Sequence, residues 1–217
     1  MTVAMAAHHA GASDVRRALR AAAWTSAFLH AVGLALAVTT MNPGTPAFPV
    51  PQRMAYVAAR PGGWVAGWLV WVTCALALVA FMALLARAHP LAATRAALVL
   101  ALGGAAIDIG CDLVYAWVLP ARAAGDVAGF LAFERALSAA SLTGANGLYS
   151  LSVLVSSLAL PAETTARRLG LLTFAGGAVL AAAGLIGDPR LVIAGTAVTI
   201  PAFVAWSLSV SSLPPRT

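Results

Sequence analysis

Six long apolar stretches constrain the fold of this chain more than any other feature of its sequence. A helix needs about 20 mainly apolar residues to cross a bilayer, with roughly 17 as the lower limit. In lipid, every backbone polar group must also be satisfied within the span, which favours helices. We therefore predict an all-α integral membrane protein, a bundle of six transmembrane helices. The predicted spans are residues 21–40, 63–86, 96–120, 139–160, 170–187 and 191–213.

Composition agrees with this prediction. Apolar residues make up 61% of the 217 residues and charged residues only 9%, whereas soluble domains carry about 25% charged residues. We expect membrane lipids around the chain and a multi-pass location in the inner (plasma) membrane. The net charge of +6 does not indicate a nucleic-acid partner, because the arginines lie in the N-terminal tail and in short loops rather than in one patch.

The arginines predict the orientation of the bundle. Cytoplasmic segments of membrane proteins carry the excess of basic residues. With the N-terminus inside, the inner segments contain eight arginines, namely Arg16, Arg17, Arg20, Arg87, Arg95, Arg167, Arg168 and Arg216. The outer loops then contain five, namely Arg53, Arg60, Arg122, Arg135 and Arg190. We therefore predict N-in and C-in, with a cytoplasmic tail at 1–20 and one transmembrane domain at 21–213.

The first apolar stretch has an alternative interpretation as a cleavable signal peptide. Arginines precede it, and Ala35-Leu36-Ala37 imitates a cleavage site. However, His30 interrupts the apolar run, and the polar stretch before it is long. Both features favour a retained membrane span.

The outer connection 41–62 is the most distinctive loop. Four prolines stiffen its first half towards an extended form. Residues 52–60 are predicted to form a short helix that Pro61 and Gly62 end. Loops of this length are often functional, so a lid over a cavity and a plain surface connector both stay open.

The second outer connection, 121–138, carries Phe130, Phe133 and Leu137 at helical spacing. Such a segment either lies at the membrane interface or extends the fourth helix outward.

Two acidic residues lie deep inside the third apolar stretch. Asp108 and Asp112 are one helical turn apart, which places both carboxyl groups on one face of the helix. An ionised Asp at the bilayer centre costs roughly 2.5–3.5 kcal/mol, so two of them in one span need partners or protons. Ionisable residues inside a membrane indicate a functional site. The structural alternative is a pair of acids that ties helices together.

Three further polar residues are predicted to lie at the same depth as these acids. Counted from the centre of each stretch, at about 1.5 Å per residue, His30, Asn146 and Tyr149 fall in the same thin slab. A His beside an Asp forms a proton-handling unit, although a lone His can also simply pack helices by hydrogen bonding. The candidate catalytic residues are Asp108, Asp112, His30, Tyr149 and Asn146.

Three tryptophans form a stripe on the second predicted helix. Trp64, Trp68 and Trp71 recur at helical spacing, and Trp71 lies too deep for the interfacial belt. Aromatic faces of this kind can hold an apolar ligand or stabilise a cation, whereas packing against a neighbouring helix is the alternative. With Cys111 and Tyr115 of the third helix, these tryptophans form the predicted substrate pocket.

Neither a metal nor a cofactor is predicted. One His, two Asp and one Cys could ligate an ion, but no HxxxH or CxxC spacing is present. Gly104, Asp108 and Asp112 are similar to the end of the motif of CDP-alcohol phosphotransferases. In this chain Arg87 and Pro90 occupy the positions of that family's first metal-binding aspartates, so the dinuclear site of the family is not expected.

Three functions stay open. The first is a membrane-embedded enzyme with acid/base chemistry on a lipid or isoprenoid, in which an apolar pocket keeps a carboxyl group protonated. The second is a proton-coupled small transporter or channel, with the acids and His30 as the relay. The third is a non-catalytic partner or sensor subunit. An apolar small-molecule ligand fits the first, and a homodimer or a membrane-protein partner fits the others.

Overall fold

A computed structural model describes residues 2–59 and 61–214 of the protein. Within these residues the chain folds into helices and loops, with no β-strand. Arg60 and Arg216, which entered the prediction of orientation, lie outside the described residues. Five helices are long and apolar enough to cross a membrane, so the chain is a multi-pass membrane protein. The five spans are Ser13–Val38, Gly62–Ala88, Ala92–Ala123, Thr165–Ile186 and Pro189–Ser211.

These spans belong to five long helices, and each contains one predicted stretch or nearly all of it. The helices are α1 (Thr2–Val38), α3 (Pro61–Ala88), α4 (Ala92–Ala123), α7 (Thr165–Ile186) and α8 (Pro189–Ser211). The residues expected as a tail are helical from Thr2 onward and continue directly into the first span. Pro61 begins α3 rather than ending the helix before it, as suits a residue without a backbone donor.

The predicted fourth span, 139–160, is not among the five. Helical structure does run without a break from Val127 to Leu158, but in three pieces. These are α5 (Val127–Ser138), a π-helical segment (Ala139–Ala145) and α6 (Asn146–Leu158). Each piece alone is too short to cross a bilayer. Residues 121–138 thus extend the next helix outward, one of the two arrangements expected.

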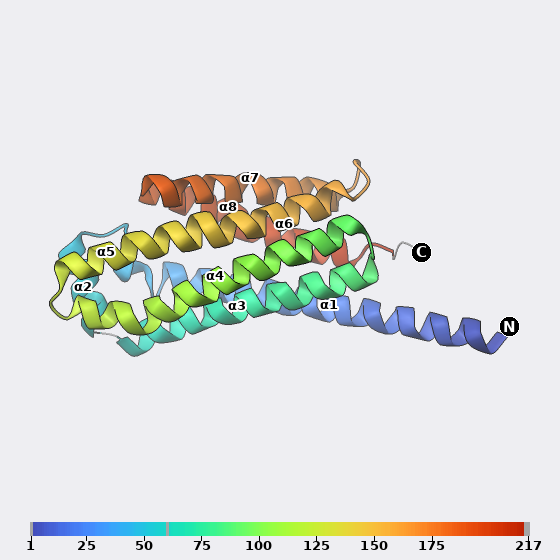
Figure 1. The fold of residues 1–217 in the computed structure, drawn as a ribbon, viewed down its shortest axis with the longest axis horizontal. Helices are drawn as coiled ribbons and strands as arrows, with labels where there is room; N and C mark the ends of the chain where they lie inside the picture. Colours follow the sequence, from blue (N-terminus) through green and yellow to red (C-terminus); the bar gives the residue numbers. More distant parts are fainter. Residues whose placement is uncertain (1, 60, 215–217) are drawn as a thin grey trace.

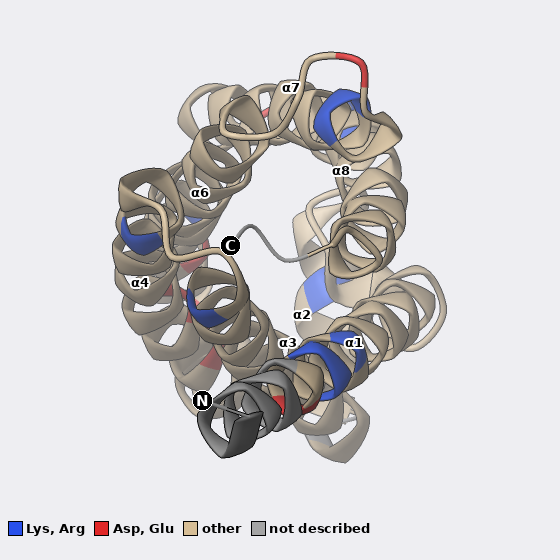
Figure 2. Ribbon diagram, turned by 90° about the vertical axis from the view of Figure 1, so that its right-hand side faces the viewer, with Lys and Arg blue, Asp and Glu red and all other residues tan. Residues whose placement is uncertain are grey.

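The long helices form a closed ring in chain order. Helix α1 packs on α3, α3 on α4, α4 on α6, α6 on α7, α7 on α8, and α8 returns to α1 (Figure 2). Both chain ends lie at one end of the ring, here called the terminal end (Figure 1). The opposite end carries the short helix α2 (Val50–Ala59) and is called the α2 end. Each long helix therefore presents one side to the interior and another to the surroundings.

Small residues bring α6 and α7 close together. Three glycines recur every seven residues along α7, and a Cβ at any of them would collide with a hydroxyl group of the facing segment. A repeat of seven keeps one seam of a helix against its neighbour, and small residues allow the backbones to approach. The facing pairs are Gly170 with Ser157, Gly177 with Ser150, and Gly184 with Thr143.

Two apolar clusters fill the ring at different heights. The cluster of the terminal end includes the fully buried Leu19, Phe81 and Trp206. The cluster of the α2 end includes Val57 and Phe130, which are equally buried. The polar residues of the middle lie between these two apolar layers.

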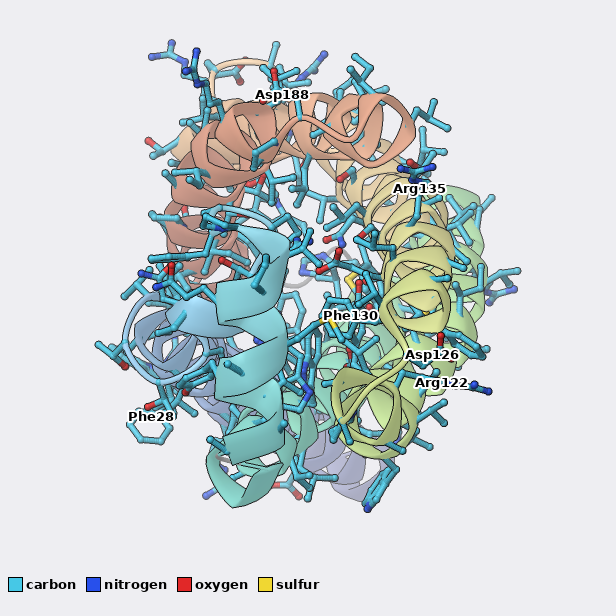
Figure 3. All side chains as sticks on the ribbon, turned by 90° about the vertical axis from the view of Figure 1, so that its left-hand side faces the viewer. Phe28, Arg122, Asp126, Phe130, Arg135 and Asp188 are labelled. Carbon is cyan, nitrogen blue, oxygen red and sulfur yellow. The ribbon has the colours of Figure 1, made fainter. Side chains whose placement is uncertain are left out.

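Helix α2 lies over part of the α2 end of the ring (Figure 3). It packs on α4 and buries Met54 and Val57. Its Arg53 forms a salt bridge with Glu134 of α5 at 2.8 Å, with side chains 6% and 10% exposed. The same guanidinium lies over the ring of Phe130, 5.8 Å from its centre. The connection is thus a docked cap rather than a loose surface loop.

Candidate functional site

Asp108 and Asp112 lie on the inner face of α4, near the middle of the helix. Asp108 accepts two hydrogen bonds from the helix that follows, one from Ser141 Oγ at 3.0 Å and one from the Tyr149 hydroxyl at 3.3 Å. Asp112 is 2% exposed, and its Oδ2 atom has no partner among the described residues. The two carboxyl groups therefore have different surroundings, although they are one turn apart.

Local backbone features bring the donors to Asp108. Gly104 lies one turn before it on α4, and a Cβ there would be 2.8 Å from the ring of Tyr149. The missing side chain lets that ring lie against α4, so that its hydroxyl group reaches the carboxylate. Ser141 belongs to the π-helical segment, and Asn146 donates from Nδ2 to the Ser141 carbonyl oxygen at 3.1 Å. Such segments occur frequently at functional sites.

This geometry favours one proton on the pair. Donors to a carboxylate stabilise its charged form, and Asp108 has two of them. Asp112 has none among the described residues, and two charged carboxylates one turn apart in an apolar environment repel each other. The geometry therefore favours Asp112 over Asp108 as the group that carries a shared proton. A buried carboxylic acid next to an acceptor can deliver and recover a proton.

Cysteines also lie near the carboxyl groups. Cys74 of α3 is buried and lies within electrostatic range of both carboxyl groups and of the Tyr149 hydroxyl. Cys111 is buried beside Asp112 in the sequence, and both cysteines are free thiols. Within the described residues, no group of three or more His, Cys, Asp or Glu side chains is arranged to hold a metal ion.

His30 contacts residues of α1, α3 and α8. Its Nδ1 atom donates to the Ser26 carbonyl oxygen one turn earlier on α1, at 2.8 Å. Its ring lies between Phe203 of α8, at 4.7 Å, and Trp71 of α3, at 6.4 Å between ring centres. None of the hydrogen bonds among the described residues joins His30 to Asp108 or Asp112, and the contacts of His30 are those of a helix-packing histidine, one of the two interpretations that the sequence left open.

Three of the predicted substrate-pocket residues, Trp64, Trp68 and Tyr115, pack on one another. Trp68 stacks on Tyr115 with ring centres 4.1 Å apart and planes 3° from parallel. Trp64 packs edge-on against Trp68 and donates from Nε1 to the Tyr115 carbonyl oxygen at 2.7 Å. The Tyr115 hydroxyl meets Ser138 Oγ at 3.1 Å. Trp64 and Trp68 therefore serve the packing of α3 on α4, whereas Trp71 faces His30.

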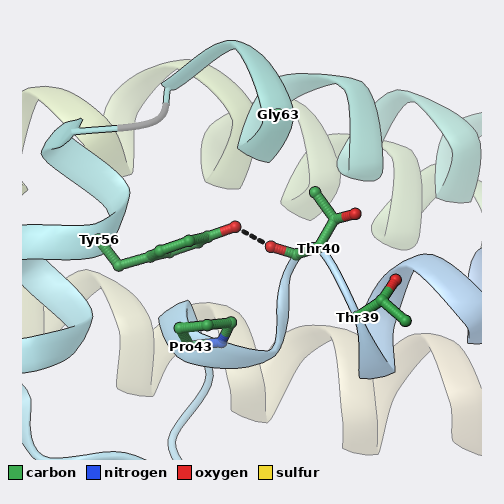
Figure 4. Close-up of a pocket in the computed structure, with 5 residues that line it drawn as sticks. All are labelled: Thr39, Thr40, Pro43, Tyr56 and Gly63. Atoms are coloured by element: carbon green, nitrogen blue, oxygen red, sulfur yellow. Dashed lines mark hydrogen bonds between the residues drawn. The ribbon is translucent and has the colours of Figure 1, made fainter.

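A pocket does occur at the α2 end (Figure 4). Its walls are Thr39, Thr40, Pro43, Tyr56 and Gly63. The Tyr56 hydroxyl donates to the Thr40 carbonyl oxygen beside it, which ties α2 to the end of α1. The pocket opens to the outside and contains none of the predicted site residues.

Sequence reasoning missed three contributors to this architecture. Ser141 and Gly104 hold Asp108, and Arg53 holds the cap. Gly104 precedes Asp108 by one turn, so the need for close approach at the acids was readable from that spacing. No local pattern singled out Ser141 or Arg53.

No protein-family model, curated protein or solved structure matches the chain.

Proposed function

We propose that the protein is a membrane-embedded enzyme in which the Asp112 carboxyl group acts as a general acid on a lipid or isoprenoid substrate. The observation that carries the proposal is the unpartnered Asp112 beside the doubly hydrogen-bonded Asp108. A proton given to a substrate double bond leaves a carbocation, and loss of another proton to the same carboxylate restores the acid. The reaction class is therefore an isomerisation or cyclisation.

The surroundings of the pair favour this chemistry over a proton relay. Apolar clusters lie on both sides of the polar layer, and they contain Phe81 and Trp206 towards one end and Phe130 towards the other. A relay would need polar groups or water through both clusters. A lipid substrate would instead enter from the bilayer, where an apolar setting keeps Asp112 protonated.

The proposed enzyme has six spans. In addition to the five helices described, residues 139–158 follow α5 as 20 helical residues, which cover about 30 Å, enough for the hydrocarbon core. An even number of crossings agrees with the two chain ends lying at one end of the ring.

We place the protein in the plasma (inner) membrane. The distribution of the arginines supports an orientation with the terminal end of the ring in the cytoplasm. Seven described arginines lie at or near that end, namely Arg16, Arg17, Arg20, Arg87, Arg95, Arg167 and Arg168. Four lie towards the α2 end, namely Arg53, Arg122, Arg135 and Arg190, and of these Arg53 is neutralised by its buried partner. In this orientation α2 is an outer lid over the ring.

Deuterium incorporation tests the proposed function. The protein is reconstituted into nanodiscs of native lipid extract in D₂O, and the lipids are returned to ordinary water and weighed by mass spectrometry. We expect one lipid class to retain deuterium in C–H bonds. The label should vanish in Asp112→Asn, because an amide keeps the shape of the group but cannot exchange a proton in this pH range. Asp126→Asn is the matched control, since Asn caps a helix as well as Asp does.

The same preparation separates the alternatives. If no lipid gains deuterium while proteoliposomes take up protons in a manner that needs Asp112, the protein is a proton-coupled transporter and the enzyme proposal fails. If neither signal appears and Asp112→Asn leaves cellular function intact, the partner function remains.

A further inference from the structure

The His30 ring carries its proton on a defined nitrogen. Its Nδ1 atom lies 2.8 Å from the Ser26 carbonyl oxygen, which can only accept a hydrogen bond. Nδ1 therefore bears the hydrogen, and Nε2 presents a lone pair. The side chain of His30 is 6% exposed, and Nε2 has no hydrogen-bond partner among the described residues.

An unpaired acceptor at this depth calls for a donor. The hydrocarbon core of a bilayer offers no water to satisfy polar groups, so each unpaired group is unfavourable there. Ser156 and Ser157 are buried without partners among the described residues, but a serine hydroxyl reaches a carbonyl oxygen of its own helix by rotating one bond. His30 has no such freedom, because its first nitrogen already holds the ring in place.

The neighbours of His30 define the rest of the site. The rings of Phe203 and Trp71 flank the imidazole on two sides. Gly33, three residues along α1, leaves room for Trp71, since a Cβ there would lie 3.3 Å from the indole ring. Cys74, one turn beyond Trp71 on α3, lies within electrostatic range of Asp112. Trp71 and Cys74 thus lie one turn apart on α3, the first beside the imidazole ring and the second near the buried acid.

We propose that His30 Nε2 accepts a hydrogen bond from the hydroxyl group of a lipid-soluble alcohol bound inside the ring. The apolar body of the alcohol runs along Trp71 towards Asp112. The donor is neutral, because no described carboxylate contacts His30 and a buried ammonium group beside two aromatic rings would lack a counter-charge. This inference rests on the proposed function for the apolar character of the ligand, and it adds the polar group by which that ligand is recognised.

Binding of phytol, a twenty-carbon isoprenoid alcohol, tests the inference without turnover. Affinity is measured by tryptophan fluorescence in nanodiscs on Asp112→Asn protein, and phytane and phytyl methyl ether serve as probes without a hydroxyl donor. We expect phytol to bind about fivefold more tightly than either, the ratio that one hydrogen bond contributes. His30→Phe should remove this preference and leave phytane binding unchanged. His30→Gln should keep it, because its amide oxygen lies near the position of Nε2.

Nitrogen-15 NMR of labelled histidine distinguishes binding from a purely structural role, because the signal of a structural His30 would not change when an alcohol is added. We expect the Nε2 resonance of His30 to shift when phytol is added and to stay in place with phytane. Equal affinity for all three probes would overturn the inference, as would a His30→Phe variant that binds phytol normally. A hydrogen-bonded Nε2 signal already present without alcohol would mean that water alone occupies the site. Phytol binding that needs His30, without any deuterium label in lipids, would refute the enzyme proposal and leave this inference standing.

Discussion

The buried salt bridge between Arg53 and Glu134 should decide whether α2 stays docked on the ring. We consider the variant Arg53→Met, which keeps most of the apolar stem and removes the charge. Breaking a buried pair by removing one partner costs about 3–5 kcal/mol, because the other charge stays buried without compensation. Docking of α2 buries Met54 and Val57, which contribute about 1.5–3 kcal/mol each. The free energy lost with the salt bridge is therefore comparable to the free energy that burial of Met54 and Val57 contributes to docking, and α2 should undock.

Hydrogen exchange of the α2 amides measures this effect. A loss of about 3–5 kcal/mol corresponds to faster exchange by roughly two to three and a half orders of magnitude, up to the rate of a free segment. The matched control is Arg122→Met. Arg122 also pairs with an acid at 2.8 Å and lies over a phenylalanine ring, but both partners of its pair are about half exposed. Solvent screens such a pair, so exchange in α2 should hardly change.

The same variant should depend on pH in a defined direction. Burial raises the pKa of Glu134 above its ordinary value of 4.5, and Arg53 opposes that rise. Without Arg53 the pKa rises further, so the docked state takes up a proton that the undocked state lacks. The loss of docking free energy in Arg53→Met should be largest at pH above the raised pKa of Glu134 and should shrink as the pH falls through that pKa. It should be absent at pH below the ordinary pKa of a glutamate side chain. Adding Glu134→Gln should restore protection at high pH. An Arg53→Met variant with normal exchange, or a double variant as labile as the single one, would refute this reasoning.

Two further changes test the packing and the topology. Gly195→Ala should lower the melting temperature, because its Cβ would lie 2.9 Å from the Leu180 backbone nitrogen and overpacking costs about 1–3 kcal/mol of stability. Gly110→Ala is the control and should be neutral or slightly stabilising, because nothing lies within 4 Å of a Cβ at that position. Equal melting temperatures of the two variants would contradict the tight α7–α8 contact. Reporter fusions at residues 50 and 164 should report opposite sides of the membrane, with 164 cytoplasmic, and the same side for both would overturn the orientation.

The spans could be predicted from the sequence because their length is a property of the bilayer. An apolar run such as 63–86 must be helical and must cross, and α3 contains it whole. The predicted fourth span, 139–160, is not among the five spans described, because a π-helical segment between Ser138 and Asn146 divides the helix. No composition rule distinguishes such a segment from ordinary helix. Its effect is local, since it aims Ser141 at Asp108.

The candidate site could be predicted only in part. Spacing alone placed Asp108 and Asp112 on one face, and shared depth suggested Tyr149, which donates to Asp108. Shared depth does not fix the rotation of a helix about its axis, and the described residues form no hydrogen bond between His30 and either acid, whereas the imidazole contacts the rings of Trp71 and Phe203. The partners Arg53 and Glu134 are far apart in the chain, so their contact depends on how α2 folds back over the ring.

The protonation of the carboxyl pair is the central claim, and infrared spectroscopy of the reconstituted protein tests it most directly. We expect one C=O stretching band of a protonated, weakly hydrogen-bonded carboxyl group at neutral pH. That band should disappear in Asp112→Asn and remain in Asp108→Asn, because within the described part of the chain Asp108 accepts two hydrogen bonds that favour its charged form and Asp112 accepts none. Absence of any such band at neutral pH, with both groups ionising near pH 4 as free carboxyls do, would contradict the account.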